Sequence, residues 1–100
     1  MELRRLNLVF PPVLEDAVIA ALLDMPDLPG FTTLRGEGHG SSFDKASSGE
    51  RVRGRVARDM AWLVLPAERV DTVLDGLRQR LPSPDVVWWS EIVERFGRLA

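Results

Sequence analysis

The sequence contains no cysteine, no tyrosine and a single histidine, His39. The absence of cysteine excludes disulfides, thiolate catalysis and Cys-based metal or redox motifs, and it is typical of a cytoplasmic protein. No apolar stretch approaches the roughly 18 residues of a membrane-spanning helix. The N-terminal apolar run is too short for a signal peptide, because Pro11 and Pro12 interrupt it. We therefore expect one cytoplasmic domain over residues 1–100, without membrane insertion.

Apolar periodicity defines the expected secondary structure. The predicted elements are strands over residues 2–10, 31–39, 51–65 and 85–93 and helices over residues 12–25 and 66–81. The order β-α-β-β-α-β predicts a ferredoxin-like α+β sandwich, in which both helices cover one face of a four-stranded antiparallel sheet. Right-handed crossovers place the first and third strands at its centre.

The second face of this sheet is also expected to be apolar. Trp62 and Leu63 point to opposite faces, as do Trp88 and Trp89, because successive strand residues alternate. An open face would instead alternate with polar residues. Since two helices cover one face only, we predict a homo-oligomer whose sheets face one another.

Two functional classes lack the residues that they require. Base stacking by this strand order needs aromatic residues on the two central strands, and these strands offer Phe10 at one end and Trp62; the pI is about 5.3. The polar residues Asn7, Ser90 and Glu91 form no nucleophile–base spacing. We therefore predict neither a nucleic-acid-binding protein nor an enzyme.

The stretch over residues 35–58 differs from the rest of the chain in charge. It holds six basic and three acidic residues, whereas the remainder holds seven basic and twelve acidic ones. Its centre, residues 40–50, is rich in Ser and Gly and predicts a flexible loop between two extended arms. The basic arm indicates a site for an anion or an acidic partner. Alternatively, its arginines protect a solvated hairpin edge from aggregation.

The base of this arm contains the candidate ligand-binding residues. They are Arg35, Gly36, Gly38, His39, Gly40, Arg55 and Arg58. The glycines could hold an anion with backbone N–H groups or could simply allow the strand to bend. Arginine binds carboxylates and phosphates in a bidentate manner. The histidine is a candidate ligand for a divalent metal, or else an exposed loop residue.

Several motifs resemble one known family. Gly36-Glu37-Gly38-His39-Gly40 is similar to the glycine turn that enters the T-loop of PII nitrogen-regulatory proteins, and the run from Met60 to Asp71 resembles the PII strand and its V-P-D-x-x-V-D continuation. A PII-like branch encoded beside heavy-metal efflux pumps of the resistance-nodulation-division type is more similar still, through Gly38-His39-Gly40-Ser41, Ser47, Glu50, Val52, Gly54-Arg55 and Gly97-Arg98-Leu99. The resemblance extends over nearly the whole chain.

The resemblance implies a homotrimer of ferredoxin-like subunits with inward-facing sheets. It implies a small-ligand site in the cleft between subunits at the loop base, where Arg95 and Arg98 loosely match a C-terminal basic pair. It also implies a loop that contacts a partner, such as a membrane efflux transporter or its regulator. The implied contact residues are Ser41, Ser42, Phe43, Asp44, Lys45, Arg51 and Arg53.

Three departures from PII bear on function, and two of them argue against nucleotide binding. Gly40 and Ser41 replace a Gln and a Lys that meet the nucleotide, and the phosphate loop is replaced by the cation-free residues 81–85. The absence of tyrosine excludes control by tyrosine modification. We therefore predict a regulatory protein that senses a small anionic ligand or a divalent metal, and we assign it no cofactor. Binding of the ligand is expected to order residues 40–50. The alternatives are a passive oligomeric interaction module and a metal-binding trimer resembling divalent-cation tolerance proteins.

Overall fold

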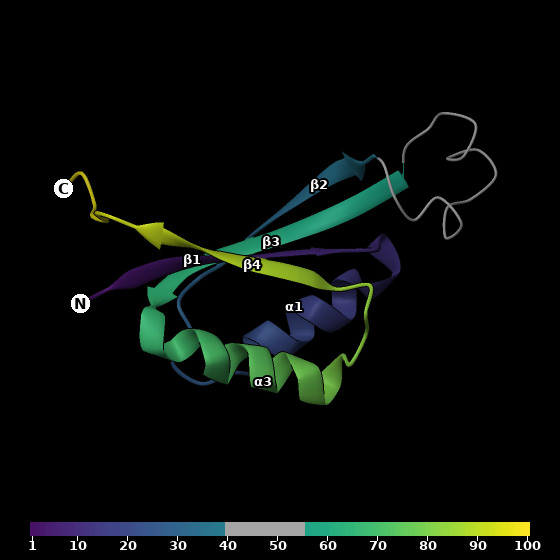
Figure 1. Cartoon of the computed structure of the whole chain (residues 1–100), viewed down its shortest axis with the longest axis horizontal. Coiled ribbons are helices and arrows are strands. Elements are labelled where there is room, and N and C mark those ends of the chain that lie inside the picture. The colour runs from purple at the N-terminus through teal and green to yellow at the C-terminus, as the bar shows by residue number, and fades with distance from the viewer. Residues whose placement is uncertain (40–55) are drawn as a thin grey trace.

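The computed structural model describes residues 1–39 and 56–100. Its elements are β1 (Leu3–Phe10), the 3₁₀ turn η1 (Pro12–Leu14), α1 (Glu15–Leu23), β2 (Thr32–Gly38), β3 (Val56–Pro66), the 3₁₀ turn η3 (Ala67–Arg69), α3 (Val70–Arg80) and β4 (Val87–Val93). The predicted α+β class and the β-α-β-β-α-β order are confirmed. Both helices lie on one side of the sheet, and β2 and β3 extend past the helices as an arm (Figure 1).

The sheet has the order β2-β3-β1-β4, so the first and third strands are central as predicted. All three strand pairs are antiparallel. Residues directly opposite one another in register share a face of the sheet. The pairing of Leu8 with Ala61 and Trp88 therefore places these three side chains on the side of the helices.

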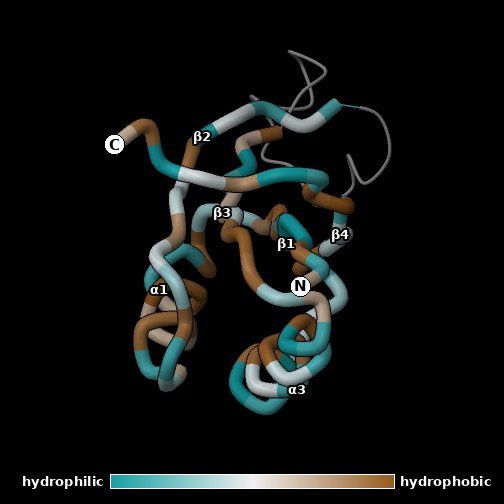
Figure 2. Tube along the Cα trace, turned by 90° about the vertical axis from the view of Figure 1, so that its left-hand side faces the viewer, coloured by the Kyte–Doolittle hydropathy of each residue, from teal (hydrophilic) through white to brown (hydrophobic). Residues whose placement is uncertain are grey.

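The core lies between this face and the two helices, which run side by side beneath the sheet (Figure 2). Leu6, Leu8 and Phe10 of β1 are almost fully buried, as are Val18 and Leu22 of α1. α3 adds its apolar stripe at helical spacing, consisting of Val70, Val73, Leu74 and Leu77. Burial of these side chains, each worth roughly 1.5–3 kcal/mol, determines which face of each amphipathic helix turns inward.

The boundaries of the elements differ from the prediction by a few residues at several ends. Each predicted helix begins with a 3₁₀ turn. Pro12 opens η1, whereas Pro66 still belongs to β3 and caps η3, which begins at Ala67. The last strand begins at Val87 rather than at residue 85, because a turn closes there with a bond from the Val86 N–H to the Ser83 carbonyl. The predicted strand residues 51–55 lie outside the described residues. Within the part of the chain that the structure describes, no helix is long and apolar enough to span a membrane.

The face of the sheet turned away from the helices is largely apolar and open to solvent. Leu34, Val87 and Trp89 keep 52%, 55% and 40% of their surface exposed. Trp88 and Trp89 lie on opposite faces, as the sequence predicted. A contiguous apolar surface of this kind is typical of a protein–protein interface. Covering of this face by further copies of the chain therefore stays a prediction.

Candidate functional site

The base of the β2–β3 arm presents different residues on its two faces. Arg35 is opposite Asp59, on the face that carries the helices. Gly36 is opposite Arg58, on the other face. The structure therefore separates two of the predicted ligand-binding arginines, Arg35 and Arg58, between the two sides of the arm.

The helix side of the arm base carries a pair of carboxyl groups. Asp59 is 3% exposed, and its Oδ2 atom has no hydrogen-bond donor. It lies opposite Phe10, the last residue of β1, shortly before Glu15 begins α1. The hydrogen bond with Asp59, followed by desolvation, raises the pKa of Glu15 above its ordinary value of 4.5, and the positive charge of Arg35 opposes this rise. Two carboxyl groups can form a hydrogen bond only when one is protonated, so the pair retains a proton more readily than a free Glu does.

On the opposite side of the arm base, Arg58 lies beside Gly36 and Gly38 of the neighbouring strand. A Cβ atom added to Gly38 would lie 3.2 Å from Cγ of Arg58 and 3.3 Å from Cγ2 of Val56. Glycine at this position therefore lets the Arg58 stem lie close to the neighbouring strand. Nη1 of Arg58 donates to the Ala57 carbonyl at 2.8 Å. Among the described residues no carboxylate pairs with this guanidinium.

His39 follows the last residue of β2 and is exposed. Within residues 1–39 and 56–100, no group of three or more His, Cys, Asp or Glu side chains could hold a metal ion. The remaining predicted residues of the arm lie outside the described residues. They are the ligand candidates Gly40 and Arg55 and the partner-contact candidates Ser41, Ser42, Phe43, Asp44, Lys45, Arg51 and Arg53.

Arg95 and Arg98 follow β4, in an exposed C-terminal segment. This segment lies at the end of the molecule opposite to the arm (Figure 1). Within one protomer, the structure therefore does not bring these two arginines to the arm base. A site that includes them needs the C-terminus of a neighbouring copy.

The sequence reasoning missed Glu15 and Asp59. A signal for Asp59 was available, because this acidic residue occupies an inward position of an otherwise apolar alternation, two residues before Ala61. No comparable signal exists for Glu15, since an acidic residue in the first turn of a helix is ordinary. The pairing of β1 with β3 and the position of α1 directly after β1 bring the two carboxyl groups together.

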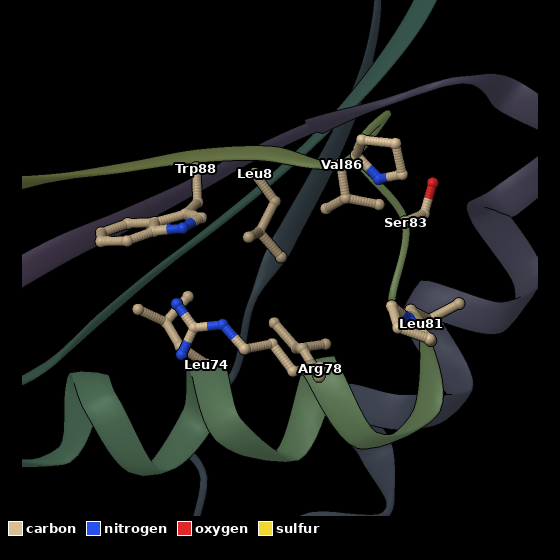
Figure 3. Close-up of a pocket in the computed structure, with 10 residues that line it drawn as sticks. Leu8, Leu74, Arg78, Leu81, Ser83, Val86 and Trp88 are labelled. Carbon is tan, nitrogen blue, oxygen red and sulfur yellow. The ribbon is translucent and has the colours of Figure 1, made fainter.

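A cavity of about 230 Å³ opens between α3 and β4. Leu8, Leu74 and Leu81 form much of its apolar lining, and Trp88 lies over the extended side chain of Arg78 (Figure 3). The guanidinium of Arg78 is paired with Asp75 at 3.0 Å. Residues 81–84, which follow α3, border this cavity. The cavity is therefore suited to apolar groups and offers no free cation to a phosphate.

The fold matches that of PII-like proteins of known structure. A nitrogen regulatory PII-like protein from Thiomonas intermedia K12, bound to ADP, AMP and bicarbonate, superposes with a TM-score of 0.70 at 21% identity, over 100% of this chain and 98% of that one. Arabidopsis thaliana PII bound to citrate superposes with a TM-score of 0.75 at 17% identity, over 98% of this chain and 83% of that one. The arrangement is thus that of a PII-like ferredoxin-like domain.

A crystal structure of a DUF3240 family protein from Shewanella baltica OS155 superposes with a TM-score of 0.79 at 16% identity, over 98% of this chain and 97% of that one. The family model "Protein of unknown function (DUF3240)" matches residues 1–100. The chain belongs to the DUF3240 family. Its sequence matches no curated protein significantly.

Proposed function

We propose that the chain is the subunit of a homotrimeric PII-like regulatory protein that binds a small anionic ligand at the base of the β2–β3 arm. In this proposal the inward-facing sheets form the trimer, and the ligand lies in the cleft between neighbouring subunits. Ligand binding alters how residues 40–50 contact a partner. The protein performs no catalysis and acts in the cytoplasm.

The observation that carries the proposal is Arg58. Its guanidinium lies at the arm base without a carboxylate partner among the described residues, beside Gly36 and Gly38. The glycines leave backbone on this face free of side chains, so an anion can approach both the guanidinium and the main chain. Arg35, in contrast, faces the carboxyl pair of Glu15 and Asp59, which already balances its charge.

The structural neighbours favour an anionic ligand. ADP, AMP, bicarbonate and citrate, named for two of them, all present negatively charged oxygens. Arginine recognises such groups through paired hydrogen bonds. Because residues 81–85 contain no cation, we place the anionic contact at Arg58 and, from a neighbouring copy, at Arg95 and Arg98.

The proposed partner is a membrane transporter of the heavy-metal efflux type or its regulator. This part of the proposal rests on the motifs Gly38-His39-Gly40-Ser41 and Gly97-Arg98-Leu99 and on the PII-like fold. The arm projects away from the helices and from the C-terminal end of the sheet (Figure 1). It is therefore placed to reach a second protein while the sandwich remains unchanged.

Isothermal titration of the purified wild type with ADP, AMP, bicarbonate and citrate tests the ligand. A charged hydrogen bond contributes about 1.5–3 kcal/mol, so Arg58→Gln should weaken binding roughly 10- to 100-fold. Arg80→Gln is the matched control, because Arg80 pairs with Asp24 at 2.7 Å on the helical side, and it should leave binding unchanged. Native mass spectrometry of the same samples reports the number of subunits and any retained ligand.

Each outcome selects a different function. Equal affinities of wild type and Arg58→Gln would remove Arg58 from the site. The absence of heat with any of the four anions would favour a passive interaction module. Heat with Zn²⁺, Cu²⁺ or Co²⁺ that disappears in His39→Ala would favour the metal-binding trimer. A monomeric mass at micromolar concentration would contradict the proposed assembly.

A further inference from the structure

The open face of the sheet has a polar centre within an apolar surround. Asn7 is opposite Trp62 on one side and Trp89 on the other, and all three lie on the face away from the helices. Arg5 and Glu91 are directly opposite one another in the neighbouring row. A charged pair at the centre of an apolar face requires a physical explanation, since burial of such charges is costly.

The negative half of this centre is fixed by hydrogen bonds from Asn7 and Trp89. Asn7 is 1% exposed, and its Nδ2 donates to Oε2 of Glu91 at 3.0 Å and to the Arg5 carbonyl at 3.2 Å. Nε1 of Trp89 donates to the same Oε2 atom at 3.0 Å. Among the described residues, no side chain donates to Oε1 of Glu91. The carboxylate is thus fixed in position with one oxygen unused.

The positive half is Arg5, two residues before Asn7 on β1. The guanidinium carbon of Arg5 lies 4.4 Å from the centroid of the Trp62 ring, and Nε of Arg5 is buried without an acceptor. Stacking occupies the face of the guanidinium and leaves its N–H edge directed away from the ring. Although Arg5 and Glu91 are register partners, they form no ion pair within the described part of the chain. Arg5 stacks on Trp62 instead, and Glu91 accepts hydrogen bonds from Asn7 and Trp89.

We propose that the open face binds a second copy of this chain and that Arg5 of one copy pairs with Oε1 of Glu91 in the neighbouring copy. The occupant follows from charge complementarity, since the same face presents one fixed, unpaired cation and one fixed, half-used anion side by side. In a closed symmetric ring, each copy pairs its Arg5 with one neighbour and its Glu91 with the other, so that both groups gain a partner. Leu34, Val87 and Trp89 around the centre supply the apolar contact area. The inference rests on the self-association proposed above and names the contact that sets its register.

The polar centre gives orientation rather than overall affinity. An apolar face alone tolerates rotation and sliding of one sheet on the other, whereas one buried ion pair is satisfied in a single register. Loss of one member leaves the other charge buried and unpaired, which costs more than loss of both. The two residues should therefore behave non-additively.

The experiment measures oligomer dissociation of wild type, Arg5→Gln, Glu91→Gln and the double variant by dilution in native mass spectrometry and mass photometry. A glutamine in place of Glu91 retains an acceptor for Asn7 and Trp89, so the protomer keeps its internal contacts. Each single variant should raise the dissociation constant at least tenfold. The dissociation constant of the double variant should not exceed that of the single variant that associates more weakly. Near-UV circular dichroism of the tryptophans verifies that every variant is folded.

Arg4→Gln is the matched control, because Arg4 lies on the helix side of the same strand and pairs with the exposed Glu2. It should leave dissociation unchanged. An oligomeric wild type with unaffected or strictly additive variants would overturn the Arg5–Glu91 contact and leave the proposed assembly standing. A wild type that stays monomeric at micromolar concentration would overturn both.

Discussion

Replacement of Asp59 by Asn should stabilise the protein at neutral pH. Asp59 is 3% exposed, and its Oδ2 atom has no donor. Above its raised pKa, the Glu15 carboxylate is charged and faces the Asp59 carboxyl group at the base of the arm. An Asn amide would donate to the Glu15 carboxylate without needing a proton.

The magnitude follows from two opposing contributions. A buried polar group without its hydrogen bond costs about 1–3 kcal/mol, and more when it is charged. The amide of the Asp59→Asn variant would remove this cost, but the substitution would also remove the attraction between Asp59 and Arg35, which is exposed and therefore worth about 1 kcal/mol at most. The first effect is larger, so we expect Asp59→Asn to raise the free energy of unfolding by roughly 1–2 kcal/mol at pH 7. Each kcal/mol corresponds to an increase of about 4–8 °C in Tm for a domain of this size.

The gain should depend on pH. The folded state raises the pKa of Glu15, so the contribution of the pair is fully present below pH 4.5, the ordinary value, and is lost as the pH rises through the raised pKa. In Asp59→Asn this loss is absent. The difference between the two proteins should therefore be small near pH 4 and should grow towards pH 7.

Urea unfolding at pH 4, 5, 6 and 7, at one fixed protein concentration, measures this difference. Glu15→Gln should behave like Asp59→Asn, because either change leaves one donor and one acceptor. Arg35→Gln should instead lower the free energy of unfolding at pH 7. The reasoning would be refuted if Asp59→Asn were less stable than the wild type at pH 7, or if its gain were the same at pH 4 and pH 7.

Three further predictions concern the helices and the turn after α1. Leu22→Ala should cost about 2–5 kcal/mol in urea unfolding, because Leu22 is 1% exposed in the core; a loss under about 1 kcal/mol would contradict this packing. Asp27→Gly should leave Tm unchanged or raise it slightly, because Asp27 has φ of 58° and binds Arg69 through its carbonyl; a clear loss in calorimetry would show that its side chain matters. Arg80→Gln should cost about 1 kcal/mol or less, less still in 1 M NaCl, because its pair with Asp24 is exposed; a salt-independent loss would exclude an electrostatic origin.

The order and pairing of the strands could be predicted because the sequence encodes them locally. The alternation through Leu6, Leu8 and Phe10 identifies the inward face of β1, and crossover handedness then places β1 and β3 in the centre. The ends of the elements were less predictable. Hydrogen bonds such as the one from Val86 to Ser83 decide them, and no periodicity reports these bonds.

The candidate site itself stays a prediction. The sequence directed attention to the arm base through its glycines and arginines, and register confirmed that Gly36 and Arg58 are cross-strand neighbours. It could not show that Arg35 and Arg58 lie on opposite faces, because the relative register of two strands depends on the tertiary pairing. The motifs led us to expect a PII-like fold, and the structural neighbours share that fold.

The sequence by itself determined the α+β class, the apolar second face of the sheet and the basic character of the arm, because composition and periodicity are properties of the chain alone. Only the tertiary structure decided which charges meet. It brought Glu15 to Asp59 from distant parts of the sequence, and it held Arg5 and Glu91 apart on one face although they are register partners. The physical reason is that electrostatic contacts depend on distances of a few ångströms, which strand register and side-chain packing fix after the chain has folded.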